Sequence, residues 1–282
     1  MWGVYLATTR AGIVSGLSPI DLVVLRYGPA AFIMLPWLLR AGMSDLGGVG
    51  WLRGAWLAVC AGPVFIVFAA AGYLWAPLSH GAVIQPSTAA MASIALAVVL
   101  LGERVPPARW LGALVIVGGI VLIGTGSDAG FVSDRPWIGA LLFMASGVMW
   151  GLFTVSIRRW NIGGLEATGA VAIVSALATL PPVALVGTFE RLLALPPTGL
   201  LAQMFVHGVL SGVLAIVAFG QAVRLLGAAR GALFPALVPA ATLVAGIPIT
   251  GEVPGPLEWA GALCATAGLA IAMGAFERRV TR

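Results

Sequence analysis

The sequence predicts an all-α polytopic membrane protein in which ten transmembrane helices form two inverted-topology five-helix repeats around a central cavity. Three observations lead to this fold class. Hydrophobic residues make up 60% of the 282 residues, and charged residues only 9%. The charges form short islands between apolar stretches long enough to span a bilayer, since about 20 helical residues cross its ~30 Å hydrocarbon core. The second half of the chain also repeats motifs of the first.

The predicted spans follow one another between these charged islands. Stretches such as 54–79 and 81–102 are predominantly apolar and carry no charged residue, and their glycines and prolines are compatible with transmembrane helices, which carry both. The sequence GLSP at 16–19 leads into the second span, and Gly-Glu pairs precede the fifth and tenth spans. The ten spans are residues 1–16, 19–39, 54–76, 80–101, 107–125, 137–157, 164–187, 199–223, 229–249 and 257–276.

The arginines predict the orientation of these spans. If the N-terminus is cytoplasmic, the inside connections and the tail hold most of the arginines, whereas the outside connections hold only Arg10, Arg135 and Arg191. Positive residues concentrate on the cytoplasmic side of membrane proteins, so both termini are predicted to be cytoplasmic. The basic balance therefore indicates topology and predicts no nucleic-acid partner. The inside arginines are Arg40, Arg53, Arg104, Arg109, Arg158, Arg159, Arg224, Arg230, Arg278, Arg279 and Arg282.

Two copies of a five-span unit account for the repeated motifs. "WGVYLATTR" from Trp2 to Arg10 matches "WGLFTVSIR" from Trp150 to Arg158, and "LGERVPPARWLGALVIVGG" matches "TGEVPGPLEWAGALCATAG". The repeats are residues 1–125 and 137–276. Because five is odd, the second copy enters the membrane upside down, which is a construction used by secondary transporters.

The first span is too short to cross a bilayer. It has 16 residues with Arg10 among them, against the ~20 that a span requires. In the second repeat Trp150 is preceded by the apolar residues 137–149, whereas Trp2 follows Met1 alone. The N-terminal part of the first helix is therefore predicted to be missing from this sequence.

A family resemblance rests on the order and doubling of these motifs. Trp-Gly in spans one and six, "GLSPIDLVVLRY" before and within span two, a proline in spans four and nine, and Gly-Glu before spans five and ten resemble the EamA-type exporters of the drug/metabolite transporter superfamily. Within it, the chain is most similar to the bacterial aromatic amino acid exporters. The resemblance implies a multi-pass carrier of the bacterial inner membrane, with spans one to four and six to nine around a central path.

The acidic residues limit the cargo. All ten lie at or near connections, so no carboxylate is expected at the membrane centre, where a cation/proton antiporter of the small multidrug type needs one. A neutral or zwitterionic cargo fits better. We therefore expect a secondary transporter, an exporter or facilitative carrier, of aromatic and other neutral amino acids or similar small metabolites, working by alternating access. The alternative is another cargo of the same superfamily, such as nucleotide sugars, sugar phosphates or purine-type metabolites.

Candidate substrate-binding residues come first from polar groups at membrane depth. Arg26 lies about 10 Å below the outer surface by helical rise; it either meets a substrate carboxylate, snorkels outward or ties two helices together. Pro86 and Pro235 are expected either to kink spans four and nine, since interrupted helices at matching positions indicate a central site, or only to shape helix packing. The polar and aromatic candidates near them are His80, Gln85, Ser87, Thr88 and Phe234, with Ser211 beside His207 on span eight.

Aromatic residues supply the remaining candidates. Trp2 and Tyr5 share a helix face because they are three residues apart, as do Trp150 and Phe153 at the matching positions. These two pairs are expected either to clamp a planar apolar side chain between them or to belong to interfacial belts.

An enzyme is not expected from this sequence. It has two histidines, no cluster of Cys, His and carboxylate at metal-ligand spacing and no phosphate-cradling nucleotide motif. No cofactor, metal or catalytic residue is therefore predicted. The expected partners are a small-molecule substrate and the lipid bilayer, with the oligomeric state left open.

Overall fold

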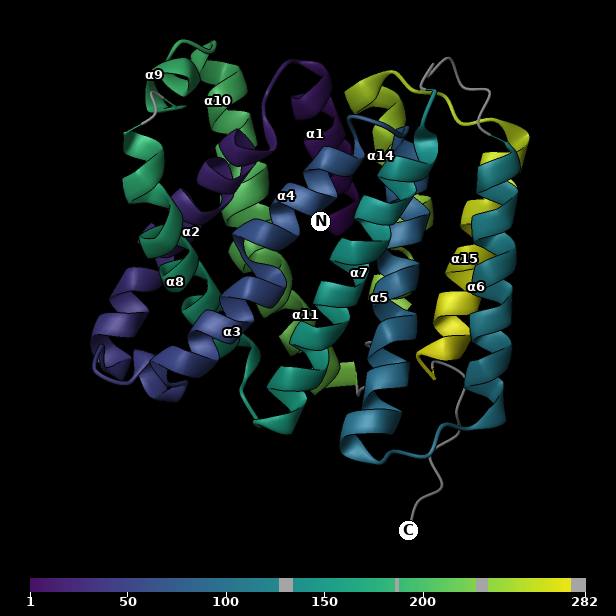
Figure 1. The fold of residues 1–282 in the computed structure, drawn as a ribbon, viewed down its shortest axis with the longest axis horizontal. Coiled ribbons are helices and arrows are strands. Elements are labelled where there is room, and N and C mark those ends of the chain that lie inside the picture. Colours follow the sequence, from purple (N-terminus) through teal and green to yellow (C-terminus); the bar gives the residue numbers. More distant parts are fainter. Residues whose placement is uncertain (127–133, 186–187, 227–232, 275–282) are drawn as a thin grey trace.

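The computed structural model describes residues 1–126, 134–185, 188–226 and 233–274, and within these ranges every regular element is a helix (Figure 1). In this described part of the chain, seven helical segments are long and apolar enough to cross a membrane, and two shorter apolar helices, Val238–Thr250 and Pro256–Ala272, follow them. The all-helical, multi-span prediction is thereby confirmed. The seven segments are Pro19–Ala41, Trp51–Gly72, Leu78–Leu101, Pro107–Thr125, Pro136–Arg159, Gly164–Ala184 and Pro197–Phe219.

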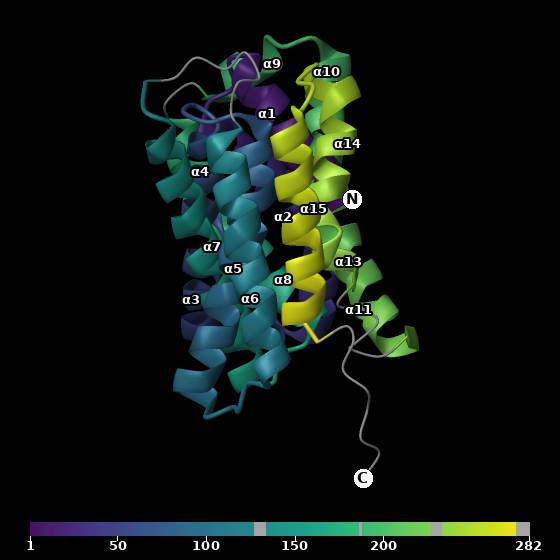
Figure 2. The ribbon, with the colours of Figure 1, turned by 90° about the vertical axis from the view of Figure 1, so that its right-hand side faces the viewer.

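The helices run up and down in one bundle, and Met1 lies near its mid-height in both ribbon views (Figures 1 and 2). Their bounds are α1 Trp2–Val14, α2 Pro19–Ala41, η1 Leu46–Gly48, α3 Trp51–Ala61, α4 Pro63–Gly72, α5 Leu78–Leu101, α6 Pro107–Thr125, α7 Pro136–Arg159, α8 Gly164–Ala184, α9 Thr188–Leu193, α10 Pro197–Met204, η2 Phe205–Leu214, α11 Ala215–Leu226, α13 Leu233–Ala236, α14 Val238–Thr250 and α15 Pro256–Ala272.

Helix ends follow local chemistry. Ser18 and Asp21 form a capping box at the start of α2, with Pro19 in the first turn, where its missing N–H costs nothing. Gly102 and Gly251 end α5 and α14 in the left-handed conformation, with φ of 67° and 73°. A glycine adopts this conformation without a Cβ penalty. Each repeated Gly-Glu pair therefore begins with the residue that stops a helix.

Three predicted spans are interrupted, two of them where the sequence suggested continuous helices and the third near Pro235, where a kink was expected. Gly62 separates α3 from α4 with φ −99° and ψ −140°. The span predicted at 199–223 combines α10, the π-helix η2 and α11. Leu237 separates α13 from α14, two residues after Pro235, whereas α5 continues through Pro86. Only the second of the two prolines thus lies beside a helix break.

Helices α6 and α15 pack antiparallel at backbone contact. A Cβ added to Gly112 would lie 2.7 Å from Gly268 O, and one added to Gly261 would lie 2.7 Å from Gly119 O. Small residues allow this approach, which stabilises helix pairs in lipid by van der Waals contact. The motif glycines of the two predicted repeats therefore contact each other, Gly112 with Gly268 and Gly119 with Gly261.

Each predicted repeat also packs its first helix against the fourth helix of the other repeat, and the two second helices pack together. α1 contacts α14, α5 contacts α7, and α2 contacts α8. The glycine of each Trp-Gly motif lies in one of these contacts: a Cβ on Gly3 would lie 2.9 Å from Ala241 C, and one on Gly151 would lie 3.1 Å from Ser93 N. These glycines allow the first helix of one repeat to approach the fourth helix of the other.

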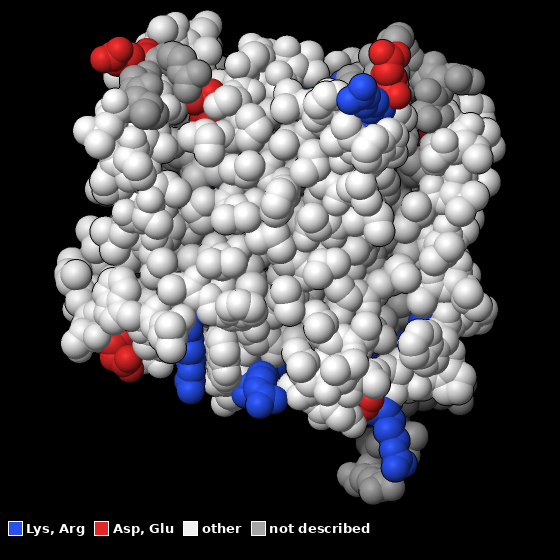
Figure 3. Space-filling view, in the orientation of Figure 1, with Lys and Arg blue, Asp and Glu red and all other residues white. Residues whose placement is uncertain are grey.

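Charged side chains gather at the two ends of the bundle on the face shown in Figure 3, with an uncharged belt between them. The ends of α2, α5 and α7, and the starts of α3 and α6, lie together at the lower end of Figure 1. That end carries the connections in which the sequence places Arg40, Arg53, Arg104, Arg109 and Arg158. The belt is the surface that a hydrocarbon layer requires.

The glycine contact predicts opposite effects for neighbouring alanine substitutions in α6. Gly119→Ala should lower the melting temperature of the purified protein in detergent, because its Cβ would lie 2.7 Å from Gly261 O and overpacking costs about 1–3 kcal/mol. Gly118→Ala is the control, because open space surrounds it and alanine favours a helix over glycine by about 1 kcal/mol. Equal melting temperatures for the two variants would show that the contact does not form.

Candidate functional site

A small cavity, partly open to the surface, lies where α2, α3, α7, α8 and the η2–α11 segment meet. Its volume is about 30 Å³, which is room for about two water molecules. A metabolite can enter only if the surrounding helices separate. The lining residues are Arg26, Tyr27, Ala30, Ala61, Trp150, Phe153, Ala167, Thr168, Val171, Ala172, Gly212 and Ile216.

Among the described residues, Arg26 is the one charged residue that lines this cavity. Its side chain is buried, with the residue 6% exposed, so it does not snorkel to the surface. Nη1 donates a hydrogen bond of 3.0 Å to Ser211 Oγ, which ties α2 to η2. Nε has no hydrogen-bond partner among the described residues. A buried cation without a paired anion is costly, so an anion in the cavity would be stabilised.

Two tyrosine rings hold the guanidinium of Arg26. Its Cζ lies 4.9 Å from the Tyr5 ring centroid and 5.9 Å from that of Tyr27. Tyr27 donates its hydroxyl to Ala61 O at 2.6 Å, which fixes the ring against α3. Cation–π contacts orient the guanidinium but leave its formal charge in place.

Trp150 and Phe153 form an aromatic wall of the same cavity. Their ring centroids are 5.2 Å apart, and the Trp150 ring also lies 5.4 Å from that of Phe65 on α4. Such tilted arrangements stabilise aromatic clusters beyond simple burial. The wall is apolar and made of two rings inclined at 41° to each other, so it suits an apolar or aromatic portion of a ligand.

Polar residues of the π-helix η2 pack beside Tyr5. His207 places Nε2 3.2 Å from Thr9 Oγ1 and Nδ1 3.1 Å from Gln203 O, and its ring packs edge-on against Tyr5 at 5.2 Å. His207 and Ser211 are four residues apart on η2, and both are buried. π-helical segments frequently occur at functional sites because they redirect side chains.

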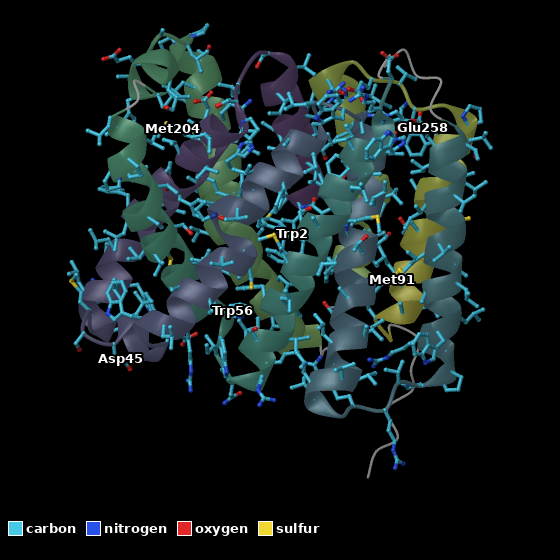
Figure 4. All side chains as sticks on the ribbon, viewed as in Figure 1. Trp2, Asp45, Trp56, Met91, Met204 and Glu258 are labelled. Atoms are coloured by element: carbon cyan, nitrogen blue, oxygen red, sulfur yellow. The ribbon has the colours of Figure 1, made fainter. Side chains whose placement is uncertain are left out.

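The structure brings some of the predicted site residues together. Arg26, Trp150 and Phe153 line the cavity, and Tyr5 and Ser211 contact Arg26 directly. Trp2 packs instead against Phe219, with centroids 5.8 Å apart, and Figure 4 shows it near mid-height of the bundle.

The candidates beside the prolines lie outside the cavity lining. Gln85 and Thr88 lie on α5, and a Cβ on Gly147 of α7 would lie 2.7 Å from Thr88 Cβ. His80 Nδ1 and Ser87 Oγ are buried without a hydrogen-bond partner among the described residues. Phe234 is 50% exposed. The remaining candidates, Pro86 in α5 and Pro235 in α13, also lie away from the cavity.

Sequence reasoning did not identify the small residues that shape the cavity. Ala30, Ala61, Ala172 and Gly212 line it, but alanine and glycine are so common in this chain that their identity carries no signal. Tyr27 was also missed, although it directly follows Arg26. Its hydroxyl bond to Ala61 depends on helix packing that the sequence does not show.

An ion pair lies at each end of the bundle. At one end Arg10 Nε contacts Glu252 Oε1 at 2.6 Å, and Arg10 Nη1 donates to Tyr73 O at 2.7 Å. At the other end Arg158 pairs with Glu103. The Arg10 and Glu252 side chains are 7% and 21% exposed, whereas those of Arg158 and Glu103 are 47% and 38% exposed.

Glu258 makes further hydrogen bonds at the end of the bundle that carries the Arg10–Glu252 pair. It accepts a hydrogen bond from Ser79 Oγ and another from Gly255 N at 2.8 Å, and Leu78 N donates to Glu252 Oε2 at 2.9 Å. Figure 4 labels Glu258 at the upper end, near the start of α15. The loop between α14 and α15 is thus fastened to the start of α5. Among the described residues, no group of three or more His, Cys, Asp or Glu is placed to hold a metal ion.

A family model matches both halves of the chain. The EamA-like transporter family matches residues 1–125 and 137–274. The protein belongs to the EamA-like transporter family. Because this is a family of transporters with several membrane-spanning helices, the protein is a multi-pass membrane protein.

The chain is also similar to several curated proteins and to a solved structure. An uncharacterised protein of Pseudomonas aeruginosa is 30% identical over 82% of this chain and 77% of its own length. An uncharacterised transporter of Archaeoglobus fulgidus is 22% identical over 90% of this chain and 87% of its own. A probable terminal-alkyne amino-acid exporter of Streptantibioticus cattleyicolor is 28% identical over 63% and 58%. A solved crystal structure shares the fold, with a TM-score of 0.59, 20% identity and coverage of 96% and 94%.

The aromatic wall predicts that Trp150→Ala lowers transport at least about tenfold while the protein still reaches the membrane. Removing the indole takes away one face of the cavity and its contacts with Phe65 and Phe153. Trp137→Ala is the matched control, since Trp137 lies on the same helix and is 59% exposed. The measurement is uptake or efflux in reconstituted liposomes. Equal flux for the two variants would remove Trp150 from the cargo site.

Proposed function

We propose that the protein is a secondary transporter that exports aromatic and other neutral amino acids, or similar small metabolites, across the inner membrane of a bacterium. The observation that carries this proposal is the cavity in which the buried Arg26 borders the aromatic pair Trp150 and Phe153. An amino acid offers a carboxylate for the cation and a side chain for the wall. The relative described as a probable terminal-alkyne amino-acid exporter supports the same cargo class.

Ten membrane helices in two inverted repeats, residues 1–125 and 137–276, are part of this proposal. The glycine contacts support it, because exchanging the two repeats converts the Gly112–Gly268 contact into the Gly261–Gly119 contact. Exchanging the repeats likewise converts the α1–α14 pair into the α7–α5 pair, and the contact of Gly3 into that of Gly151. Both termini are proposed to face the cytoplasm.

Alternating access follows from that symmetry. The two ion pairs join matching residues of the proposed repeats, Arg10 with Glu252 and Arg158 with Glu103, and they lie at opposite ends. Their unequal burial indicates a state closed at the Arg10 end and looser at the Arg158 end. In the opposite state the burial of the two pairs would be exchanged, because inverted repeats can exchange their conformations.

A cavity with one described cation suits an amino acid, which has one carboxylate, better than cargo with several negative charges. Nucleotide sugars and sugar phosphates carry a phosphate dianion or a diphosphate, which requires several cationic partners. Among the described lining residues, Arg26 is the only cation. Amino acids, with one carboxylate, match this site better.

The proposal predicts saturable movement of labelled phenylalanine, tryptophan or threonine across liposomes that contain the purified protein. Counterflow by unlabelled amino acid should accelerate exchange, because a carrier with alternating access exchanges cargo on both sides. Empty liposomes and Trp150→Ala protein serve as controls. Absence of saturable flux for all three amino acids, or saturable flux of a sugar phosphate instead, would overturn the amino-acid assignment.

The unequal ion pairs predict unequal stability effects. Arg10→Gln should reduce the free energy of unfolding by about 3 kcal/mol, because it leaves a largely buried carboxylate without its cation. Arg158→Gln should cost less than about 1 kcal/mol, because exposed pairs contribute little. Melting temperatures in detergent measure both variants, and the charge-swapped Arg10→Glu/Glu252→Arg protein should recover part of the loss. A larger loss for Arg158→Gln than for Arg10→Gln would contradict the assigned closed end.

A further inference from the structure

We infer that the site recognises its cargo by a carboxylate and not by an amino group, so that its substrate class includes arylalkyl monocarboxylic acids without an amine. This inference rests on the proposed function, because it places the cargo in the same cavity. It goes beyond it by stating which of the two charges of an amino acid the protein binds. The argument starts from the hydrogen-bonding state of Arg26.

The guanidinium of Arg26 has an unused edge. Nη1 is occupied by Ser211, whereas Nε is buried without a hydrogen-bond partner among the described residues. A carboxylate accepts two parallel N–H bonds from the edge of a guanidinium that includes Nε. The residue is 6% exposed, so bulk water does not provide this partner efficiently. A carboxylate in the cavity would accept a hydrogen bond from Nε and would neutralise the positive charge of Arg26.

No protein carboxylate competes for that place within the described part of the chain. The two buried acidic residues there are engaged at helix ends. Asp21 Oδ2 accepts from Ser18 N at 2.8 Å in the cap of α2, and Glu258 bonds Ser79 and Gly255. No described ion pair involves Arg26. Its positive charge is therefore available to a ligand.

An ammonium group finds no corresponding anion. The described residues that line the cavity include no aspartate or glutamate, and the one hydroxyl-bearing side chain besides Tyr27 is Thr168. Thr168 donates its Oγ1 hydrogen to Gly164 O at 2.6 Å within α8. An ammonium ion beside Arg26 would also meet a like charge. The amino group of a bound amino acid thus adds repulsion without an ion-pair partner.

The remainder of the ligand faces Trp150 and Phe153. These rings, with Ala61, Ala167 and Ile216, make the other walls apolar. A planar aromatic group on a short chain places its carboxylate at Arg26 and its ring on this wall. Dicarboxylates and phosphate esters bring a second charge that no described lining residue matches.

A matched ligand series tests the inference on the unmodified protein. Phenylalanine, 3-phenylpropanoate, phenethylamine and phenylalanine amide keep the same ring and vary only the two charged groups. Isothermal titration calorimetry on purified protein in detergent should give 3-phenylpropanoate a Kd equal to or lower than that of phenylalanine, and the two ligands without a carboxylate at least tenfold weaker binding. Binding of phenethylamine as tight as that of 3-phenylpropanoate would overturn the inference, and so would an absence of 3-phenylpropanoate binding.

Variants then assign the effect to Arg26. Arg26→Gln should abolish the preference for the acid, and Arg26→Lys should retain it because the charge remains. Arg53→Gln is the control, because Arg53 is exposed at a helix start and its guanidinium lies over Trp160 at 5.5 Å, away from the cavity. An unchanged acid preference in Arg26→Gln would overturn the assignment to Arg26.

Binding and flux separate the two proposals. If 3-phenylpropanoate binds with the expected preference but no amino acid crosses liposomes, the carboxylate inference stands and the proposed amino-acid transport fails. If labelled phenylalanine crosses liposomes with saturation and 3-phenylpropanoate neither binds nor competes, transport stands and the inference fails.

Discussion

The antiparallel backbone contact between α6 and α15 is the constraint on which the rest of the structure depends. Gly112, Gly119, Gly261 and Gly268 leave no room for a side chain, so the two helices meet in one register. Lipid provides no hydrophobic force between helices, and close packing of small residues supplies the attraction instead. This contact joins the ends of the two proposed repeats, while α1–α14 and α5–α7 join their first and fourth helices.

The cavity lies among α2, α7, α8 and the π-helix, and neither α6 nor α15 contributes a residue to its described lining. Arg26 is held there by Ser211 and by two tyrosine rings, none of which neutralises its charge. The structure thus combines tight contacts that fix helices with one buried cation that is paired with no carboxylate of the described residues. Functional sites commonly break local rules that the rest of a fold obeys.

The sequence predicted the features that depend on composition and repetition. Long apolar stretches predicted the helices, and the doubled Trp-Gly and Gly-Glu motifs marked residues that the structure uses for close packing and for helix ends, such as Gly151 and Gly251. Arg26 stood out because charge at membrane depth is expensive. The break at Gly62 and the π-helix around Ser211 were not predicted, since both depend on neighbouring helices. For the same reason the sequence grouped Gln85 and Ser87 with the site, while the structure places them on α5 outside the cavity lining.

The central claim is that two matching halves move against each other so that the ion pairs at opposite ends open in turn. It is tested by electron–electron distance measurements on spin labels in lipid nanodiscs, after Cys60 and Cys264 are replaced by alanine. One label pair at Leu74 and Val253 reports the Arg10 end, and a second pair at Arg104 and Leu225 reports the Arg158 end. The account predicts that saturating cargo lengthens the label distance at one end of the bundle and shortens the label distance at the other end in the same molecules. Distances that change together at both ends, or at neither end, would contradict it.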